Sequence, residues 1–369
     1  MAQQDARSES RRESDPLVDV DVHHAWGDES DLTPYLPPQY QDRWEMYGVP
    51  GGHKPYANNG GQLAVMADVA EAYDDMAYSA PREPVREELL DSIGVDVAHL
   101  TGMLVYGASS ATDKRYANAV CRAFNDYTVD EWLDHDDRFR YSLAVNHQDP
   151  QWTAEEIRRL GDHPQVVSVM LPTGATRAFG DSMYDPIYEA ATEQDLAVAM
   201  HFGNNCSTMH GYPPTAAGWP NDYVEFRLLR RCMYQAHLGS FVFQGTFEKF
   251  PDLRVLMLES GWAWVPSFLW LMVSEWKAFR SDVPWVERNP KEYVKDHVTF
   301  STQPVEEPTE PGALDDIIEW MDGEQTLAFA SDFPHFDFDH PDRTLAHLDD
   351  ETRRRITSQN ALEALNISP

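Results

Sequence analysis

The fold is decided by residues 166–203, which read VVSVMLPTGATRAFGDSMYDPIYEAATEQDLAVAMHFG. The short β-rich run VVSVML (166–171) predicts a strand, and the spacing of apolar residues in DPIYEAATEQ (185–194) predicts a helix. The next run, LAVAMHFG (196–203), predicts a second strand. A helix between two consecutive strands is typical of a parallel sheet, because parallel neighbours need a crossover connection.

The same alternation continues in both directions along the chain. Helical patterns such as TAEEIRRLGD (153–162) and GALDDIIEWMDGE (312–324) separate short apolar runs. Eight such runs are present: LVDVDVHHA (17–25), VAHLTGMLVY (97–106), FRYSLAVN (139–146), VVSVML (166–171), LAVAMHFG (196–203), RVLMLES (254–260), HVTFST (297–302) and LAFASDF (327–333). Eight repeats favour a closed sheet, and the absence of a GxGxxG turn after the first run argues against a dinucleotide-binding fold. The sequence therefore predicts an α/β fold, the (β/α)8 TIM barrel.

One domain, residues 16–369, accounts for the predicted barrel. Residues 1–15 are rich in Ser, Arg and Glu, a composition typical of a disordered tail. Residues 26–95 form a long insertion between the first two predicted strands and include a helical pattern at 61–76. Because a loop after a barrel strand lies on the face that carries the active site, we predict that this insertion acts as a lid. A second long helical region is predicted over 221–250.

The composition is strongly acidic, since 62 acidic residues against 29 basic ones give a formal net charge of -33. The acidic residues are spread along the whole chain, which resembles the proteins of halophilic microbes, where salt screens self-repulsion. Such a charge repels nucleic acid and anionic membranes, so we expect neither as a partner. The three cysteines form no CxxC motif, and no apolar run reaches the roughly 18 residues that span a bilayer. With no signal-peptide core at the N-terminus, the protein is predicted to be cytoplasmic.

Polar side chains stand at the carboxyl ends of several predicted strands, where barrel enzymes carry their active sites. Residues two apart in a strand point to the same side, so Asp21 and His23 of the first run face the same way. We expect four side chains to converge at one end of the barrel axis: Asp21, His23, His201 and Asp332. Two imidazoles and two carboxylates suit one divalent ion such as zinc or manganese.

Several further residues have both a functional and a structural role open to them. Glu259 ends the sixth run and is either a site carboxylate or a salt-bridged carboxylate of the barrel. Arg177 could clamp a substrate carboxylate, with a surface ion pair as the alternative. His335 is interpreted as structural or as an outer partner of a ligating imidazole. His210 and His237 have no strand context, so we expect them at the solvent or on a helix surface.

The motifs DVDVHHAW, DPIYEAATEQDLAVAMHFG, GTFEKFPDLRVLMLESGWAW and ASDFPHFDFD closely resemble the amidohydrolase-related family that contains aminocarboxymuconate-semialdehyde decarboxylase. The resemblance extends from about residue 16 onward and implies a homodimer or larger homo-oligomer. It also implies a metal held by two residues of strand 1, a His of strand 5 and an Asp of strand 8. These positions match Asp21, His23, His201 and Asp332.

Two positions depart from the family pattern. The first ligand is usually His, and the acidic Asp21 at that place resembles the aromatic-acid decarboxylase branch. The sixth strand usually ends in a catalytic His, and here the residue is Glu259. The resemblance therefore favours decarboxylation, whereas the missing histidine favours hydrolysis of an amide, ester or lactone.

We therefore expect a metal-dependent hydrolase or non-oxidative decarboxylase that acts on a small carboxylated or cyclic substrate. The metal would orient the substrate or lower the pKa of a bound water. Asp332 would shuttle the proton, as a base in hydrolysis or as a proton donor to carbon in decarboxylation, and Glu259 would assist it. Two alternatives remain open: a catalytically inactive barrel that binds a ligand or a partner, and a metal-free hydrolase that uses its carboxylates alone.

Overall fold

The computed structural model describes residues 15–49, 66, 79–203 and 218–368, which contain an eight-stranded parallel sheet. The strands are β1 (Val18–Val22), β2 (Val97–Leu100), β3 (Phe139–Ala144), β4 (Val166–Pro172), β5 (Ala197–His201), β6 (Val255–Met257), β7 (Val298–Ser301) and β8 (Leu327–Ala328). Each of the eight predicted runs coincides with one strand, although β4 extends one residue beyond its run, and neighbouring strands pair in chain order.

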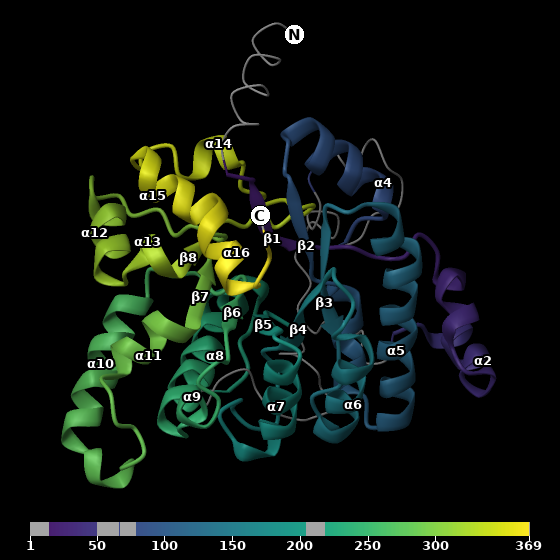
Figure 1. Ribbon diagram of the computed structural model, residues 1–369, viewed down its shortest axis with the longest axis horizontal. Coiled ribbons are helices and arrows are strands. Elements are labelled where there is room, and N and C mark those ends of the chain that lie inside the picture. The colour runs from purple at the N-terminus through teal and green to yellow at the C-terminus, as the bar shows by residue number, and fades with distance from the viewer. Residues whose placement is uncertain (1–14, 50–65, 67–78, 204–217, 369) are drawn as a thin grey trace, which may run out of the picture.

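The first strand closes the sheet against the segment that follows β8. The Val20 N–H donates to the Phe329 carbonyl at 3.0 Å, and the His23 N–H donates to the Phe333 carbonyl at 2.9 Å. Val22 and Phe333 also form a parallel bridge. In Figure 1 the last helix, α16 (Asn360–Ala364), lies beside β1, so the two ends of the barrel meet there. The predicted (β/α)8 barrel is confirmed.

Helices connect the strands and form the outer layer of the barrel (Figure 1). The longer ones are α2 (Pro38–Tyr47), α5 (Lys114–Glu131), α6 (Pro150–Leu160), α7 (Asp185–Glu193), α8 (Tyr223–Phe243), α10 (Val265–Ala278), α11 (Pro290–His297) and α12 (Ala313–Trp320). Shorter ones are α4 (Arg82–Pro84), α9 (Thr246–Lys249), α13 (Gly323–Thr326), α14 (Pro341–Thr344) and α15 (Asp350–Arg354). Tighter or wider helical turns are η1 (Glu29–Tyr35), η2 (Val85–Ile93), η3 (Met103–Ser110), η4 (Leu133–His135), η5 (Ser182–Tyr184), η6 (Arg280–Asp282) and η7 (Arg355–Gln359).

The long helical region predicted over 221–250 is confirmed as α8 followed by α9. The side chain of Asp222 caps α8 by accepting a hydrogen bond from an N–H of the first turn, which has no partner within the helix. The buried face of α8 presents Phe226, Arg230 and Tyr234 at a spacing of four residues, which is the repeat of a helix packed on a core. A charged residue in such a row needs a partner, because arginine is rarely buried unpaired.

Only parts of the predicted insertion 26–95 belong to the described chain, namely residues 26–49, 66 and 79–95, which include η1, α2, α4 and η2. The Met66 N–H donates to the Pro334 carbonyl at 2.8 Å, at the end of the barrel where the strands finish. The rest of the insertion, with most of the predicted helix 61–76, lies outside the described residues, as does the tail up to residue 14. The lid and the disordered tail therefore stay predictions.

Two further observations concern the helices and the opposite end of the barrel. Within the described ranges, no helix is both long enough and apolar enough to cross a membrane. A cleft of about 530 Å³ lies at the opposite end of the barrel, where Asp195, Leu253 and His297 stand just before β5, β6 and β7. Barrel active sites lie at the other end, so this cleft is not the catalytic one.

Candidate metal centre

Four ionisable side chains meet at the carboxyl ends of the strands. Asp21 lies in β1, His23 follows it, His201 ends β5, and Asp332 lies in the loop after β8. One ligand atom from each lies within 4.8 Å of the others, and all four residues are at most 1% exposed. The structure thus brings together the four residues that the sequence pattern selects.

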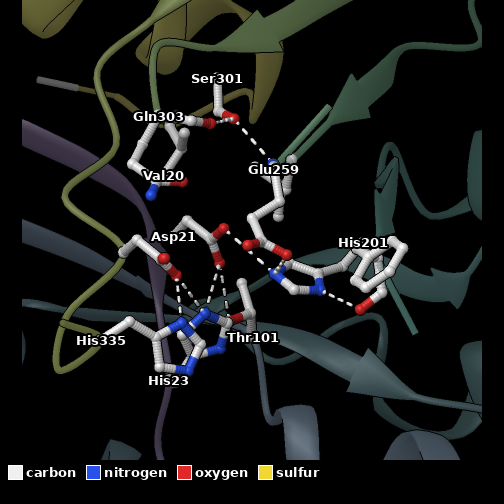
Figure 2. A network of polar contacts seen from close by, with 12 residues as sticks. Val20, Asp21, His23, Thr101, His201, Glu259, Ser301, Gln303 and His335 are labelled. Atoms are coloured by element: carbon white, nitrogen blue, oxygen red, sulfur yellow. Dashed lines mark hydrogen bonds and ion pairs between the residues drawn. The ribbon is translucent and has the colours of Figure 1, made fainter. Parts of the chain in front are cut away.

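The contacts within this four-residue cluster are short. Nε2 of His23 lies 2.7 Å from Oδ1 of Asp332 and 3.8 Å from Oδ1 of Asp21. Nε2 of His201 lies 3.3 Å from Oδ2 of Asp21. The two imidazole rings stand edge to face, with their centroids 5.0 Å apart. Figure 2 shows Asp21 between them, with ring nitrogens of both histidines turned toward its carboxylate.

The cluster has the composition of a divalent-metal site. Asp21 Oδ2, His201 Nε2 and Asp332 Oδ2 have no hydrogen-bond partner among the described residues. Asp21 Oδ2 and His201 Nε2 lie within ion-pair distance of each other, at 3.3 Å. Buried polar atoms nearly always form hydrogen bonds, so three atoms without one in the same cluster point to something that binds them. Two imidazole nitrogens and two carboxylates match the ligands preferred by zinc and manganese. The four residues therefore fit one divalent ion.

The electrostatics of the cluster favour a cation. Burial lowers the pKa of His201, but the negative charges of Asp21 and Glu259 outweigh burial and raise the pKa to about 9. For His23, burial and the neighbouring His335 lower the pKa well below its usual value. His201 thus holds a proton that a metal would replace, whereas His23 is already neutral and able to act as a ligand.

Hydrogen bonds to neighbouring groups orient the ligands. Thr101 Oγ1 donates to Asp21 Oδ1 at 3.0 Å and also lies 3.1 Å from His23 Nδ1. Nδ1 of His201 donates to the carbonyl of Phe202 at 2.9 Å, which directs Nε2 toward the cluster. Such outer partners fix the tautomer and the ring orientation of metal-binding histidines.

His335 contacts the cluster from outside, as one of its two predicted roles requires. Its Nδ1 lies 2.8 Å from Asp332 Oδ1, and its ring stacks on His23 with centroids 4.3 Å apart. Burial lowers the pKa of His335, but the charge of Asp332 raises it to about 9. Burial also raises the pKa of Asp332. The contact therefore keeps a proton close to the Asp332 carboxyl group.

A buried ion pair between Glu259 and Arg230 lies beside the cluster. Arg230 Nη1 donates to Glu259 Oε1 at 2.8 Å, and the side chains of Arg230 and Glu259 are 6% and 7% exposed, respectively. Glu259 Oε2 lies 3.8 Å from His201 Nε2. Burial raises the pKa of Glu259, but the positive charges of Arg230 and His201 outweigh burial and lower the pKa to about 2. Glu259 is thus a salt-bridged barrel carboxylate that also faces the site.

The backbone is unusual at both carboxylates that follow the strands. Glu259 has a φ of 53° and Asp332 has a φ of 62°, in the left-handed region that few residues other than glycine adopt. Hydrogen bonds hold both turns: the Glu259 N–H donates to Ser301 Oγ at 3.0 Å, and the His335 N–H donates to the Asp332 carbonyl at 2.8 Å. Such conformations cluster at functional sites, where surrounding contacts impose them.

Other sequence candidates lie away from the cluster. Arg177 is 66% exposed and pairs with Asp181 at 3.2 Å, which is the surface ion pair weighed as its alternative. His237 is buried, and its two ring nitrogens bond backbone groups of the β4–α7 connection. Its expected place at the solvent or on a helix surface is therefore wrong, because two loop backbone groups need its ring. His210 lies outside the described residues.

Two residues of the site, Thr101 and Arg230, were not predicted from the sequence. Thr101 directly follows β2, so a search of all eight strand ends for polar groups would have found it. Arg230 occupies the buried row of α8, and a charge within an apolar helical face is the signal that points to it.

Residues 20–367 match the sequence profile of the amidohydrolase family, and the match includes the whole cluster. The chain belongs to this family. No curated protein matches the chain in sequence.

Solved structures of similar fold cover almost the whole chain at low sequence identity. The 5-carboxyvanillate decarboxylase of Novosphingobium aromaticivorans, with bound manganese and 4-hydroxy-3-methoxy-5-nitrobenzoic acid, is 18% identical, with 97% of each chain covered and a TM-score of 0.67. An amidohydrolase of Mycobacterium avium subsp. paratuberculosis is 19% identical, covering 96% of this chain and 98% of its own, with a TM-score of 0.71. A Rhizobium 2,6-dihydroxybenzoate decarboxylase is 17% identical, covering 96% and 99%, with a TM-score of 0.62. These likenesses show the barrel fold.

Proposed function

We propose that this protein is a divalent-metal-dependent, non-oxidative decarboxylase of a small carboxylated aromatic or cyclic acid. The observation that carries the proposal is the buried cluster of two carboxylates and two imidazoles, three of whose ligand atoms form no hydrogen bond with the described residues. Membership of the amidohydrolase family supports a metal-dependent enzyme. Proteins of similar fold include decarboxylases of hydroxylated aromatic acids that were crystallised with manganese.

Asp21, His23, His201 and Asp332 would hold the ion. Bound there, a divalent ion supplies positive charge that orients the substrate anion and stabilises the negative charge developing in the reaction. The protein contributes a dry environment, since none of the four residues is more than 1% exposed. Exclusion of water strengthens every charge interaction within the site.

Asp332 would provide the proton that replaces the carboxylate. The ring carbon that bears the carboxylate accepts this proton, the bond to the carboxyl carbon breaks, and its electron pair returns to the ring as carbon dioxide leaves. Two features of Asp332 suit this step: burial raises the pKa of its carboxyl group, and His335 lies 2.8 Å from Oδ1 as a source of a replacement proton.

Product analysis on metal-loaded protein tests the proposal. The protein, reconstituted with manganese or with zinc, is incubated with a panel of hydroxybenzoic acids, and released carbon dioxide and the decarboxylated phenol are both quantified. Equimolar amounts of the two products are expected for at least one acid. Cleavage of an ester, amide or lactone without release of carbon dioxide from any acid would contradict the proposal.

Elemental mass spectrometry tests the assigned ligands separately from turnover. About one equivalent of metal is expected in the wild-type protein, and little in His201→Ala, because this substitution removes one of four ligands. His347→Ala is the matched control, since His347 is a partly exposed histidine outside the cluster and its variant should keep the metal. Equal metal content in both variants would remove His201 from the ligand set.

Hydrolysis of an amide, ester or lactone is the second candidate function. The observation that favours it is Glu259 at the end of β6, where the family usually has a histidine. In hydrolysis Asp332 would accept a proton from the attacking water instead of donating one to carbon. The remaining alternatives are a metal-free hydrolase, separated by the metal measurement, and an inactive barrel. The presence of all four cluster residues argues against an inactive barrel.

Other properties expected from the sequence remain predictions. These are a cytoplasmic location, adaptation to high salt, the choice between zinc and manganese, the absence of nucleic-acid and membrane partners, and a homodimer or larger assembly. Light scattering coupled to size-exclusion chromatography measures the assembly directly. To bind the substrate, Arg177 would have to contact it from an exposed position. This role is tested by comparing the Michaelis constant of Arg177→Gln with that of the wild type.

A further inference from the structure

One carboxylate oxygen beside the cluster accepts no hydrogen bond from the described residues. Oε1 of Glu259 accepts from Arg230 at 2.8 Å, whereas Oε2 lies 3.8 Å from Nε2 of His201 and accepts no hydrogen bond from any described residue. Figure 2 shows the Glu259 carboxylate turned toward Asp21 and His201, on the side where the ligand atoms converge. Oε2 is therefore an open acceptor at the edge of the site.

This acceptor is held rigidly and stays negatively charged. Arg230 binds one oxygen of Glu259, and Ser301 accepts a hydrogen bond from the Glu259 N–H at 3.0 Å. The guanidinium of Arg230 in turn lies over the Phe202 ring, 5.4 Å from its centroid. A carboxylate paired with a buried arginine remains ionised, because loss of its charge would leave the arginine unpaired in a dry environment.

Glu259 is a neighbour of the four-residue cluster and not a member of it. The set of mutually close ligand atoms comprises Asp21, His23, His201 and Asp332, and Glu259 is outside that set. Among these four, Glu259 is in ion-pair distance only of His201 in the described structure. Its free oxygen is therefore available to a substrate bound beside the cluster.

We infer that Glu259 is a specificity-determining residue that reads a hydrogen-bond donor on the substrate, so that the substrate is an acid carrying a hydroxyl or amino group next to Oε2. An ionised carboxylate has acceptors only, so it binds an O–H or N–H and repels a second carboxylate. An ether or a fluorine at the same place leaves Oε2 without a donor from the substrate, which weakens binding. This inference rests on the proposed function and specifies the class of its substrate.

The first test uses the wild-type enzyme and a series of acids that differ in one substituent. In the best hydroxybenzoic acid of the panel, each hydroxyl is replaced in turn by an amino group, which keeps the hydrogen-bond donor, and by fluorine or methoxy, which removes it. We expect kcat/KM to remain within about tenfold for the amino analogue and to fall at least ~100-fold for the fluoro and methoxy analogues. Equal rates for hydroxyl and fluorine at every position would overturn the inference.

The second test asks whether Glu259 or the metal recognises the hydrogen-bond donor of the substrate. In Glu259→Gln a neutral amide with both donor and acceptor replaces the charged acceptor at nearly unchanged volume. We expect the preference for hydroxyl over fluorine to shrink at least about tenfold, with acids that carry a second carboxylate gaining relative activity. An unchanged preference would mean that a group other than Glu259 recognises the donor, and the inference would fail.

Glu156→Gln is the matched control for this variant. Glu156 is a buried carboxylate of α6 that pairs with Arg122 and Arg159, and it is outside the four-residue cluster. Its variant should keep the substrate preference of the wild type, with metal content and melting temperature recorded for both variants. If no acid releases carbon dioxide, the proposed function itself fails; release without any donor preference refutes this inference alone.

Discussion

Two buried carboxyl groups of the site, Asp332 in the cluster and Glu259 beside it, have pKa values shifted in opposite directions. Burial raises the pKa of Asp332, whereas Arg230 and His201 hold the pKa of Glu259 at about 2 despite its burial. When the surroundings of two titratable groups shift their pKa values apart, one group is suited to act as an acid and the other to remain a base. Asp332 is therefore the carboxyl group suited to carry a proton, and Glu259 the one suited to remain an anion.

Replacement of Asp332 by asparagine should abolish turnover and leave the fold intact. The amide of Asp332→Asn cannot donate or accept the transferred proton and is a weaker ligand, so kcat should fall at least ~1000-fold, measured on the best substrate. Asp339→Asn is the matched control, because Asp339 is a partly buried carboxylate of the same loop outside the four-residue cluster. Its kcat should stay within a few-fold of wild type, and a fully active Asp332→Asn would refute the mechanism.

Metal affinity should depend on pH through His201. The pKa of this imidazole is raised to about 9, so below that pH a metal must displace a proton from it. The apparent affinity is then expected to weaken about tenfold for each pH unit lowered between about pH 8 and pH 6.5. Isothermal calorimetry in buffers of different ionisation enthalpy should detect close to one proton released per metal at about pH 7. Affinity independent of pH over this range would contradict the assignment.

At the scale of elements, the strands were predictable because each is a short apolar run bounded by helical patterns. The alternation within LVDVDVHHA already directs Asp21 and His23 to one side of β1. Strand β4 extends one residue beyond its predicted run, but the other runs exceed their strands in length: LAFASDF contains only Leu327–Ala328 as β8. The reason is that the Phe329 and Phe333 carbonyls accept hydrogen bonds from Val20 of β1 and from His23 in an irregular closing segment, which an apolar pattern does not reveal.

Residues on helices and loops were harder to assign to the site. Arg230 reaches Glu259 from α8, and the approach of α8 to the end of β6 is a tertiary contact that no local pattern encodes. His237 was misplaced for the same reason, since two loop backbone groups beyond its own helix recruit its ring. The departure from the family pattern at Glu259, in contrast, was visible in the sequence, because the surrounding motif shows that this residue stands at the end of the sixth strand.

The loop after β6 depends on glycine at position 261. Gly261 has a φ of +59°, and a Cβ added there would lie 2.4 Å from a carboxylate oxygen of Glu306, whose carboxylate accepts from the N–H groups of Trp262 and Ala263. Gly261→Ala should therefore destabilise the protein by about 1–3 kcal/mol and reduce kcat, because the same loop begins at Glu259. Urea denaturation monitored by fluorescence gives the stability, and steady-state rates give the effect on the site.

A second glycine separates backbone strain from the steric clash. Gly312 has a φ of +82°, and an added Cβ would meet no atom within 4 Å. Gly312→Ala should cost only the left-handed backbone strain, about 1 kcal/mol, with kcat unchanged. Equal stability losses in the two variants would show that the Glu306 side chain moves away from the added Cβ at no cost and that it does not constrain the loop.

At the scale of the whole molecule, the most prominent feature is a formal net charge of -33. Many arginines form surface ion pairs with the acidic residues, such as Arg138 with Asp136 at 2.7 Å and Arg288 with Asp296 at 2.6 Å. Exposed pairs contribute only about 0–1 kcal/mol each and weaken as salt is added. The acidic excess acts in the opposite sense, since its mutual repulsion destabilises the compact chain and is relieved by salt.

The net effect of salt decides which of these two contributions is larger. Because the acidic excess is large, the melting temperature should rise as sodium chloride increases from about 0.01 M to about 1 M, over which the screening length falls from about 30 Å to about 3 Å. Thermal unfolding is followed by circular dichroism at constant pH and constant metal, with sucrose of equal osmolality as the control for effects other than charge screening. A rise with salt that sucrose does not reproduce would establish that self-repulsion of the acidic surface outweighs its ion pairs. A flat or falling melting temperature would instead mean that the ion pairs outweigh the repulsion.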